Sequence, residues 1–170
     1  DMVAAGRVVA GGHRRPAADE DRAGVAHPRC ERLCLLAQQD EVFRHAVLSR
    51  GHRTEVDKGE PLFFAGDSAG GLYGIASGSL GAYLQRPDGE PLLGHIHRPG
   101  AWLGEGPAVS GDRRSLSVVA MESSELLQIP RVLINQLEAE GLGIQARLAQ
   151  LLWAGQKIAF GVITELLIPE

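Results

Sequence analysis

The sequence predicts a mainly β protein with flanking helices: an antiparallel β-sandwich of the jelly-roll type, followed by one long C-terminal helix. Three observations lead to this prediction. Short apolar runs fill the chain from about residue 53 to 129, and turn residues interrupt them every 8 to 12 positions. Apolar residues recur at helical intervals before these runs, in 31–48, and again after Pro130. Seven or eight short strands of this kind suit two packed sheets.

The composition limits the function classes. The chain has 170 residues, of which 44% are hydrophobic and 22% charged, with a formal net charge of −4. These values are ordinary for a globular protein, and an acidic chain has no global attraction to nucleic acid or to anionic membrane. No apolar run approaches the roughly 20 residues of a membrane span, and no secretory signal opens the chain. We therefore expect a soluble, cytoplasmic protein.

The chain divides into three parts. Residues 1–28 are rich in Ala, Gly and Arg without an apolar period, which predicts a flexible leader. Residues 29–140 form the sandwich domain with one or two short helices at its start, and 141–170 form the long helix. Cys30 and Cys34 are too few for a disulfide scaffold, and we expect reduced thiols.

The strands are expected where apolar runs lie between turn dipeptides such as Lys58-Gly59 and Asp88-Gly89. The expected strands are 53–56, 61–64, 71–76, 80–84, 92–97, 116–120 and 125–129. After Pro130 the spacing predicts a short helix over 131–139 and a helix of about 37 Å over 144–168.

The long helix carries two apolar flanks. One stripe predicts a seam against a second helix, and hence a homodimer; it consists of Leu148, Leu152, Gly155, Ala159, Val162 and Leu166. The other flank is expected to pack on the sandwich, and consists of Leu151, Ile158, Ile163 and Leu167. The alternative is a helix that lies on the sandwich of its own chain.

One segment has the residues of a sugar-phosphate site. Glu105 follows a strand and can accept hydrogen bonds from ribose hydroxyls, and Arg114 before the next strand presents N–H donors to a phosphate. The amides of 106–109, at a helix N-terminus, would add an anion site, with Pro107 at the first helical position. The alternative is a surface ion pair between Glu105 and Arg114.

The same residues resemble a known family. The run 66–80, which begins Gly66-Asp67, resembles the hairpin core of the cyclic nucleotide-binding domain, and Gly104-Glu105 with Arg114-Ser115 is similar to its phosphate-binding cassette. The resemblance covers roughly residues 33–168. The surroundings look most like the sensor domains of CRP/FNR-type bacterial transcription regulators.

The resemblance implies a ligand site and a mechanism. Glu105 would bind the ribose 2′-hydroxyl and Arg114 the cyclic phosphate, while Ser115 and the backbone at Gly104 and Gly106 complete the cradle. The effector would be cyclic AMP or cyclic GMP, no cofactor is required, and ligand binding would change the placement of the long helix. Arg114, as an exposed pocket residue, is expected to contribute little to the core.

The resemblance also implies the partners. Regulators of this family bind DNA through a helix-turn-helix domain after the long helix, so DNA is expected only through a C-terminal domain absent from this chain. We expect a homodimer, no membrane association and no enzyme activity. The residues after Glu105 and before Arg114 depart from the family pattern, so the alternative is a sandwich that has lost nucleotide binding and serves as a dimerisation module.

A metal-dependent enzyme of the cupin type is the remaining alternative. His95 and His97 alternate on one strand, as metal ligands do in the opening cupin motif. Glu105 follows eight residues after His97, which is too far, and no histidine follows His97. The sequence therefore predicts no catalytic residue and no metal.

Overall fold

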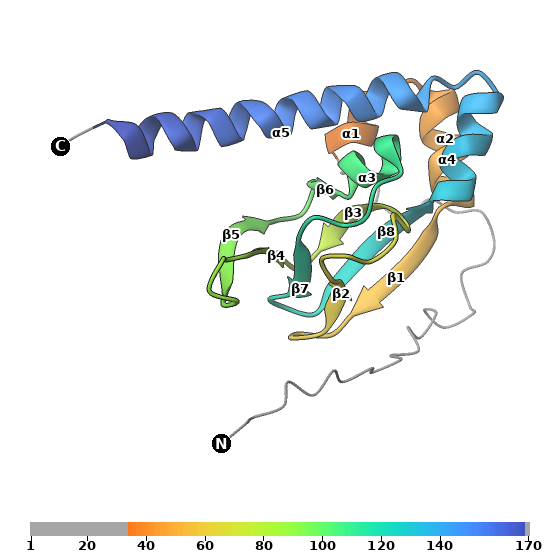
Figure 1. Ribbon diagram of the computed structural model, residues 1–170. Coiled ribbons are helices and arrows are strands. Elements are labelled where there is room, and N and C mark those ends of the chain that lie inside the picture. Colours follow the sequence, from red (N-terminus) through yellow and green to blue (C-terminus); the bar gives the residue numbers. More distant parts are fainter. Residues whose placement is uncertain (1–33, 169–170) are drawn as a thin grey trace.

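The computed structural model describes residues 34–168 of the chain, and Figure 1 shows their arrangement. The helices are α1 (Cys34–Ala37), α2 (Glu41–Arg50), α3 (Glu105–Ser110), α4 (Arg131–Ala139) and α5 (Ile144–Leu167). The strands are β1 (His52–Val56), β2 (Pro61–Phe63), β3 (Gly71–Ser77), β4 (Leu80–Gln85), β5 (Pro91–His97), β6 (Trp102–Leu103), β7 (Ser117–Ala120) and β8 (Ser124–Pro130). The predicted leader, 1–28, and Cys30 lie outside the described residues.

The strands form two antiparallel sheets of four strands, in the orders β1-β8-β3-β6 and β2-β7-β4-β5. Figure 1 shows the sheets packed on each other beneath α5, which confirms the predicted sandwich of the jelly-roll type. Each of the seven predicted strands is present, with ends displaced by at most one residue. β6 was not predicted, because a strand of two residues is too short to show an alternating pattern.

Two apolar clusters hold these layers together. The cluster between the sheets includes Ile75, Leu80 and Val118. The second cluster lies between the outer face of β1-β8-β3-β6 and the helices, and includes Leu72, Phe43 and Leu148. This sheet is therefore covered on both faces, which explains why β3 is buried without alternation from its first to its fifth residue.

The long helix packs on its own chain only in its first half. Leu148 is fully buried in the helix cluster, whereas Ile158 is 59% exposed. A Cβ added at Gly106 of α3 would lie 3.9 Å from Leu152, and one added at Gly155 would lie 3.9 Å from the carboxylate of Glu105. Leu148, Leu152 and Gly155, the first half of the seam expected to contact a second helix, therefore face their own chain.

The flank that was expected to pack on the sandwich is mostly exposed: Ile158, Ile163 and Leu167 face solvent, and only Leu151 packs against the core. This part of the prediction was wrong, and the four residues do not share one face: at ~100° per residue, Ile163 and Leu167 lie about 140° and 180° around α5 from Ile158. Both flanks are apolar, so the spacing alone could not show which of them the short helix α3 would cover. Figure 1 shows the C-terminal half of α5 extending past the sandwich.

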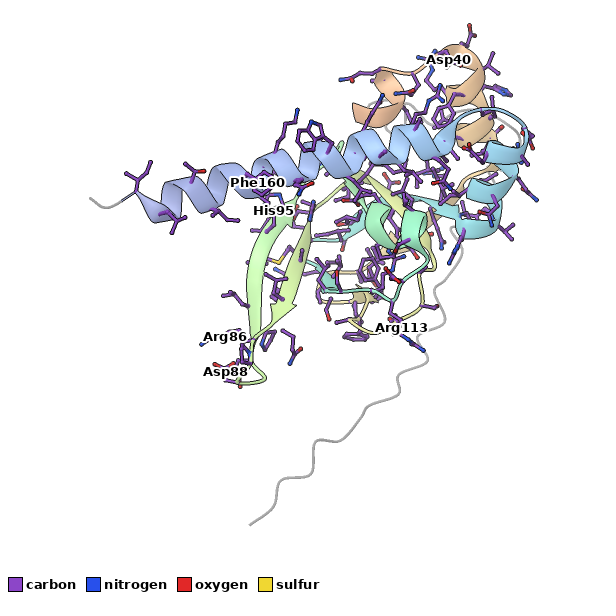
Figure 2. The ribbon with its side chains drawn as sticks, turned by 45° about the horizontal axis from the view of Figure 1, so that its top comes forward. Asp40, Arg86, Asp88, His95, Arg113 and Phe160 are labelled. Carbon is purple, nitrogen blue, oxygen red and sulfur yellow. The ribbon has the colours of Figure 1, made fainter. Side chains whose placement is uncertain are left out.

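Arg147 ties the start of α5 to the start of α2. Its guanidinium donates to Oδ2 of Asp40 at 2.8 Å, to Gln39, and to the carbonyl oxygens of Leu142 and Gly143, and it lies over the ring of Phe43. Oδ1 of Asp40 in turn accepts the amide of Phe43 and so caps α2 (Figure 2). The orientation of α5 at its origin therefore depends on one arginine.

We expect Arg147→Met to lower the free energy of unfolding by about 2 kcal/mol, because it removes several hydrogen bonds of a charged, mostly buried group. The ion pair with the exposed Asp40 contributes little to this figure. Urea denaturation checks it, with Arg98→Met on an exposed loop as the matched control. Equal effects of the two substitutions would contradict this role of Arg147.

Candidate functional site

The turn from β6 into α3 requires a glycine at position 104. Gly104 has φ 91°, a left-handed conformation, and the helix begins at the next residue, Glu105. A Cβ at Gly104 would lie 2.2 Å from Nη1 of Arg114 and 2.7 Å from the carbonyl oxygen of Gly71. Gly104 and Arg114, ten positions apart in the sequence, are therefore in direct contact.

Pro107 is the third residue of α3, and not the first as its sequence context suggested. It remains within the first turn, where no residue needs its N–H for an intrahelical hydrogen bond. The expected anion site over 106–109 is smaller for this reason: Pro107 has no N–H, and the amide of Ala108 donates to the carbonyl oxygen of Gly104 at 3.0 Å. The first-turn amide left for a ligand is that of Gly106, since the amide of Glu105 interacts with the Glu105 carboxylate.

The backbone of Arg114 is held by the turn at Gly66-Asp67. The Arg114 amide donates to the carbonyl oxygen of Asp67 at 2.8 Å, and the Gly66 amide donates to the carbonyl oxygen of Arg114 at 2.7 Å. Oδ2 of Asp67 accepts the amide of Phe64, which closes the turn. The Gly-Asp motif of the hairpin therefore positions the arginine of the cassette.

The guanidinium of Arg114 is buried, with only 4% of the residue exposed. Its Nη2 donates to the carbonyl oxygen of Gly71 at 2.7 Å, and its carbon lies 4.2 Å from the centre of the Phe63 ring. The expectation of an exposed arginine that contributes little to the core was wrong. The alternative interpretation, an ion pair between Arg114 and Glu105 on the surface, is also wrong, because Arg114 is buried.

Glu105 lies half-buried beneath α5, close to Arg114. Burial raises the pKa of its carboxyl above the ordinary value; the backbone amide of Glu105, the positive charge of Arg114 and the amide of Gly104 oppose the shift only in part. Gly155 of α5 faces this carboxylate, and Figure 1 shows α5 running directly over α3. A carboxylate and a guanidinium thus share a partly water-excluded site under a helix.

The other expected site residues lie at the edge of this arrangement. Ser115 is exposed and precedes β7 by two positions. Arg113 points outward (Figure 2), and its Nη1 donates to the carbonyl oxygen of Gly66 at 2.7 Å. Sequence reasoning missed Phe63 and the carbonyl of Gly71, because neither an apolar strand residue nor a backbone oxygen leaves a mark in the sequence.

A cupin-type centre receives no support. Within residues 34–168 no three His, Cys, Asp or Glu side chains are grouped so that they could hold a metal ion. Burial and the nearby His95 lower the pKa of His97 to about 4.

None of the described helices is long and apolar enough to cross a membrane.

Two curated proteins are similar to this chain in sequence. The fumarate and nitrate reduction regulatory protein of Vibrio cholerae is 26% identical over 139 residues, which are 74% of this chain and 52% of that protein. The cyclic AMP receptor protein of Thermus thermophilus is 32% identical over 108 residues, 61% of this chain and 50% of that protein. The chain thus spans about half the length of these curated relatives.

Among solved structures, the catabolite activator protein of Thermus thermophilus superposes with a TM-score of 0.68 at 27% identity, covering 78% of this chain and 62% of that one. The family model described as the cyclic nucleotide-binding domain matches residues 53–140, from β1 to the end of α4. This match contains the Gly-Asp turn, Glu105 and Arg114, and it extends over more than half of the sequence. The chain therefore belongs to the cyclic nucleotide-binding domain family and is related to the CRP/FNR regulators.

Proposed function

We propose that this chain is the effector-sensing domain of a CRP/FNR-type transcription regulator, and that it binds cyclic AMP or cyclic GMP at Glu105 and Arg114. The observation that carries the proposal is the buried guanidinium of Arg114 in contact with the turn that begins α3. The family is one of regulatory domains that are typically not enzymes, and we assign no catalytic role to any residue. A cytoplasmic location fits this role.

The chemistry of the site suits a cyclic nucleotide. A cyclic phosphate carries a single negative charge, which one guanidinium can neutralise through N–H donors. The carboxylate of Glu105 would accept hydrogen bonds from the ribose hydroxyls, and the amide of Gly106 and the exposed Ser115 would complete the cradle with Gly104. The Thermus thermophilus relative is named a cyclic AMP receptor protein, which supports the same ligand class here.

The position of α5 suggests how binding would be transmitted. The helix passes over Glu105 so that a methyl group added at Gly155 would lie 3.9 Å from the carboxylate, which is van der Waals contact and leaves no room for a sugar between them. A ribose bound to Glu105 would compete for this space, so the ligand would favour a different placement of α5. Such a population shift would reorient DNA-binding domains that follow α5 in the complete regulator.

The exposed half of α5 supports a homodimer. Four large apolar side chains follow a spacing of seven, three and four, which places them on one face of the helix: Trp153, Phe160, Ile163 and Leu167, each at least half exposed. Exposed apolar faces of this kind mark protein interfaces. A second copy of the chain, packed helix to helix, would bury both faces together.

A second candidate function is dimerisation without a nucleotide. The missing N–H of Pro107 favours it, because it removes a donor from the part of α3 that would face a phosphate. The two functions differ in one measurable property, which is the affinity for cyclic nucleotides.

Titration calorimetry with cyclic AMP and cyclic GMP tests the proposed ligand. We expect binding that Arg114→Lys weakens by about tenfold or more, since a lysine keeps the charge but loses the N–H donors of the guanidinium. Because Arg114 is buried, circular dichroism must first show that the variant is folded.

Arg86→Ala, at the tip of the β4–β5 hairpin (Figure 2), is the control for a lost surface charge and should bind as the unaltered chain does. Folded protein that binds neither nucleotide would contradict the proposed ligand and favour the second function.

Glu105→Gln tests the buried carboxylate in the absence of ligand. The pKa of Glu105 is raised in the folded state, so ionisation of Glu105 lowers the free energy of unfolding as the pH rises above the ordinary carboxyl range. We expect the variant to melt at a higher temperature than the unaltered chain at pH 7.5, and at nearly the same temperature at pH 4. An equal difference at both pH values would show that the substitution acts by another route.

Sedimentation equilibrium tests the homodimer. Ile163→Glu places a charge within the exposed apolar face and should convert a dimer into a monomer, because burying an unpaired charge is strongly unfavourable. Ile158→Glu is the matched control, since Ile158 is exposed on the opposite side of α5 and its replacement should leave the dimer intact. Equal effects of the two variants, or a monomeric unaltered chain, would contradict the proposed interface.

A further inference from the structure

Two histidines lie at the C-terminal end of β5, separated by Ile96. His95 pairs with Ala82 and His97 with Leu80 of β4, so both imidazoles lie on the sheet face that carries these two buried residues. β5 is the last strand in the order β2-β7-β4-β5. Figure 2 shows His95 toward the α5 side of the hairpin, far from the tip with Arg86 and Asp88.

The two rings are in contact, which their spacing in the sequence does not show. Their centroids lie 4.6 Å apart, with an angle of 81° between the ring planes. When two imidazoles bind one ion through nitrogen at ~2.0–2.1 Å, their ring centres are about 4.5 Å apart at a 90° ligand angle and about 5.2 Å apart at the tetrahedral angle. The observed separation is that of two ligands at about 90°, and a small rotation of the exposed His95 ring would open it toward the tetrahedral value.

From this geometry we propose that His95 and His97 bind a divalent transition-metal ion of the zinc, nickel or copper(II) class. Imidazole nitrogen suits these ions, whereas magnesium and calcium require oxygen ligands. No third His, Cys, Asp or Glu completes a group with them among residues 34–168, so water fills the remaining positions and the ion exchanges freely. His95 is exposed, which leaves the ion a path from solvent.

The site is separate from the proposed nucleotide site, which Glu105 and Arg114 form between β6 and β7. Metal binding to β5 is thus a property beyond the proposed function, and it is no sign of an enzyme. An ion held by the folded strand stabilises the protein in proportion to its occupancy. The melting temperature should therefore rise with metal concentration.

The test is zinc and nickel titration of the full chain after chelator treatment, followed by calorimetry and by melting temperature. We expect one ion per chain at this site. Binding should be at least about tenfold weaker in both His95→Gln and His97→Ala, because loss of a residue that merely hydrogen-bonds to a metal ligand already lowers affinity by about 10-fold to 100-fold. His52→Gln on β1 is the matched control and should bind as the unaltered chain does. The double variant His13→Gln with His27→Gln removes the histidines outside the described residues and should also retain the site.

Metal binding that persists in both β5 variants, or disappears in the His13 and His27 variant, would overturn the proposal, as would folded protein without any binding. His95→Gln keeps a polar side chain at an exposed position, so it provides a folded variant if His97→Ala does not fold. Cyclic AMP titration of the same variants separates this proposal from the proposed function, since neither histidine belongs to the nucleotide site.

Discussion

The burial of the Arg114 guanidinium is the constraint on which the site depends. A charged group is buried at low cost only where hydrogen bonds and polarisable surfaces replace its water, and here the Gly71 carbonyl oxygen and the Phe63 ring do so. Gly104 and Gly70 lack side chains where the guanidinium packs, and a Cβ at either position would lie within 3.2 Å of it. The cassette is therefore built around one arginine, and the turn at Gly66-Asp67 fixes its backbone. This packing leaves the guanidinium in a defined position, which supports the proposed anion site.

The helices connect this site to the rest of the chain. α3 lies between Glu105 and α5, and α5 is fixed at its origin by Arg147 and the apolar cluster around Leu148. Beyond Gly155, which faces Glu105, the large apolar side chains of α5 such as Ile158 and Phe160 are exposed. One end of α5 is thus anchored, its middle covers the candidate site, and its far end is exposed. This division is the basis of our proposal that a small ligand at α3 acts on a dimer interface formed by the exposed half of α5.

The sandwich could be predicted from the sequence because turn residues separate the strands, and every strand except the two-residue β6 is long enough to leave an apolar run. Glu105 and Arg114 could also be singled out in the sequence, and the structure brings them together beside Gly104, but their role as a ligand site stays a prediction. The burial of Arg114 could not be predicted, because it depends on Phe63 and on a backbone oxygen from other strands. The prediction of which flank of α5 packs on its own chain was wrong for a related reason. Both flanks are apolar, and only the three-dimensional position of α3 determines which of them is covered.

In the mechanism that we propose, a cyclic nucleotide at Glu105 and Arg114 changes the placement of α5. Spin labels at Lys58→Cys and Lys157→Cys, with Cys30 and Cys34 replaced by serine, report the distance between the sandwich and the exposed half of α5. Pulsed dipolar spectroscopy would measure this distance with and without cyclic AMP, in samples diluted with unlabelled chain so that only distances within one chain contribute. We expect nucleotide binding to shift the distance distribution. An unchanged distribution at saturating nucleotide, with binding verified by calorimetry, would contradict the mechanism.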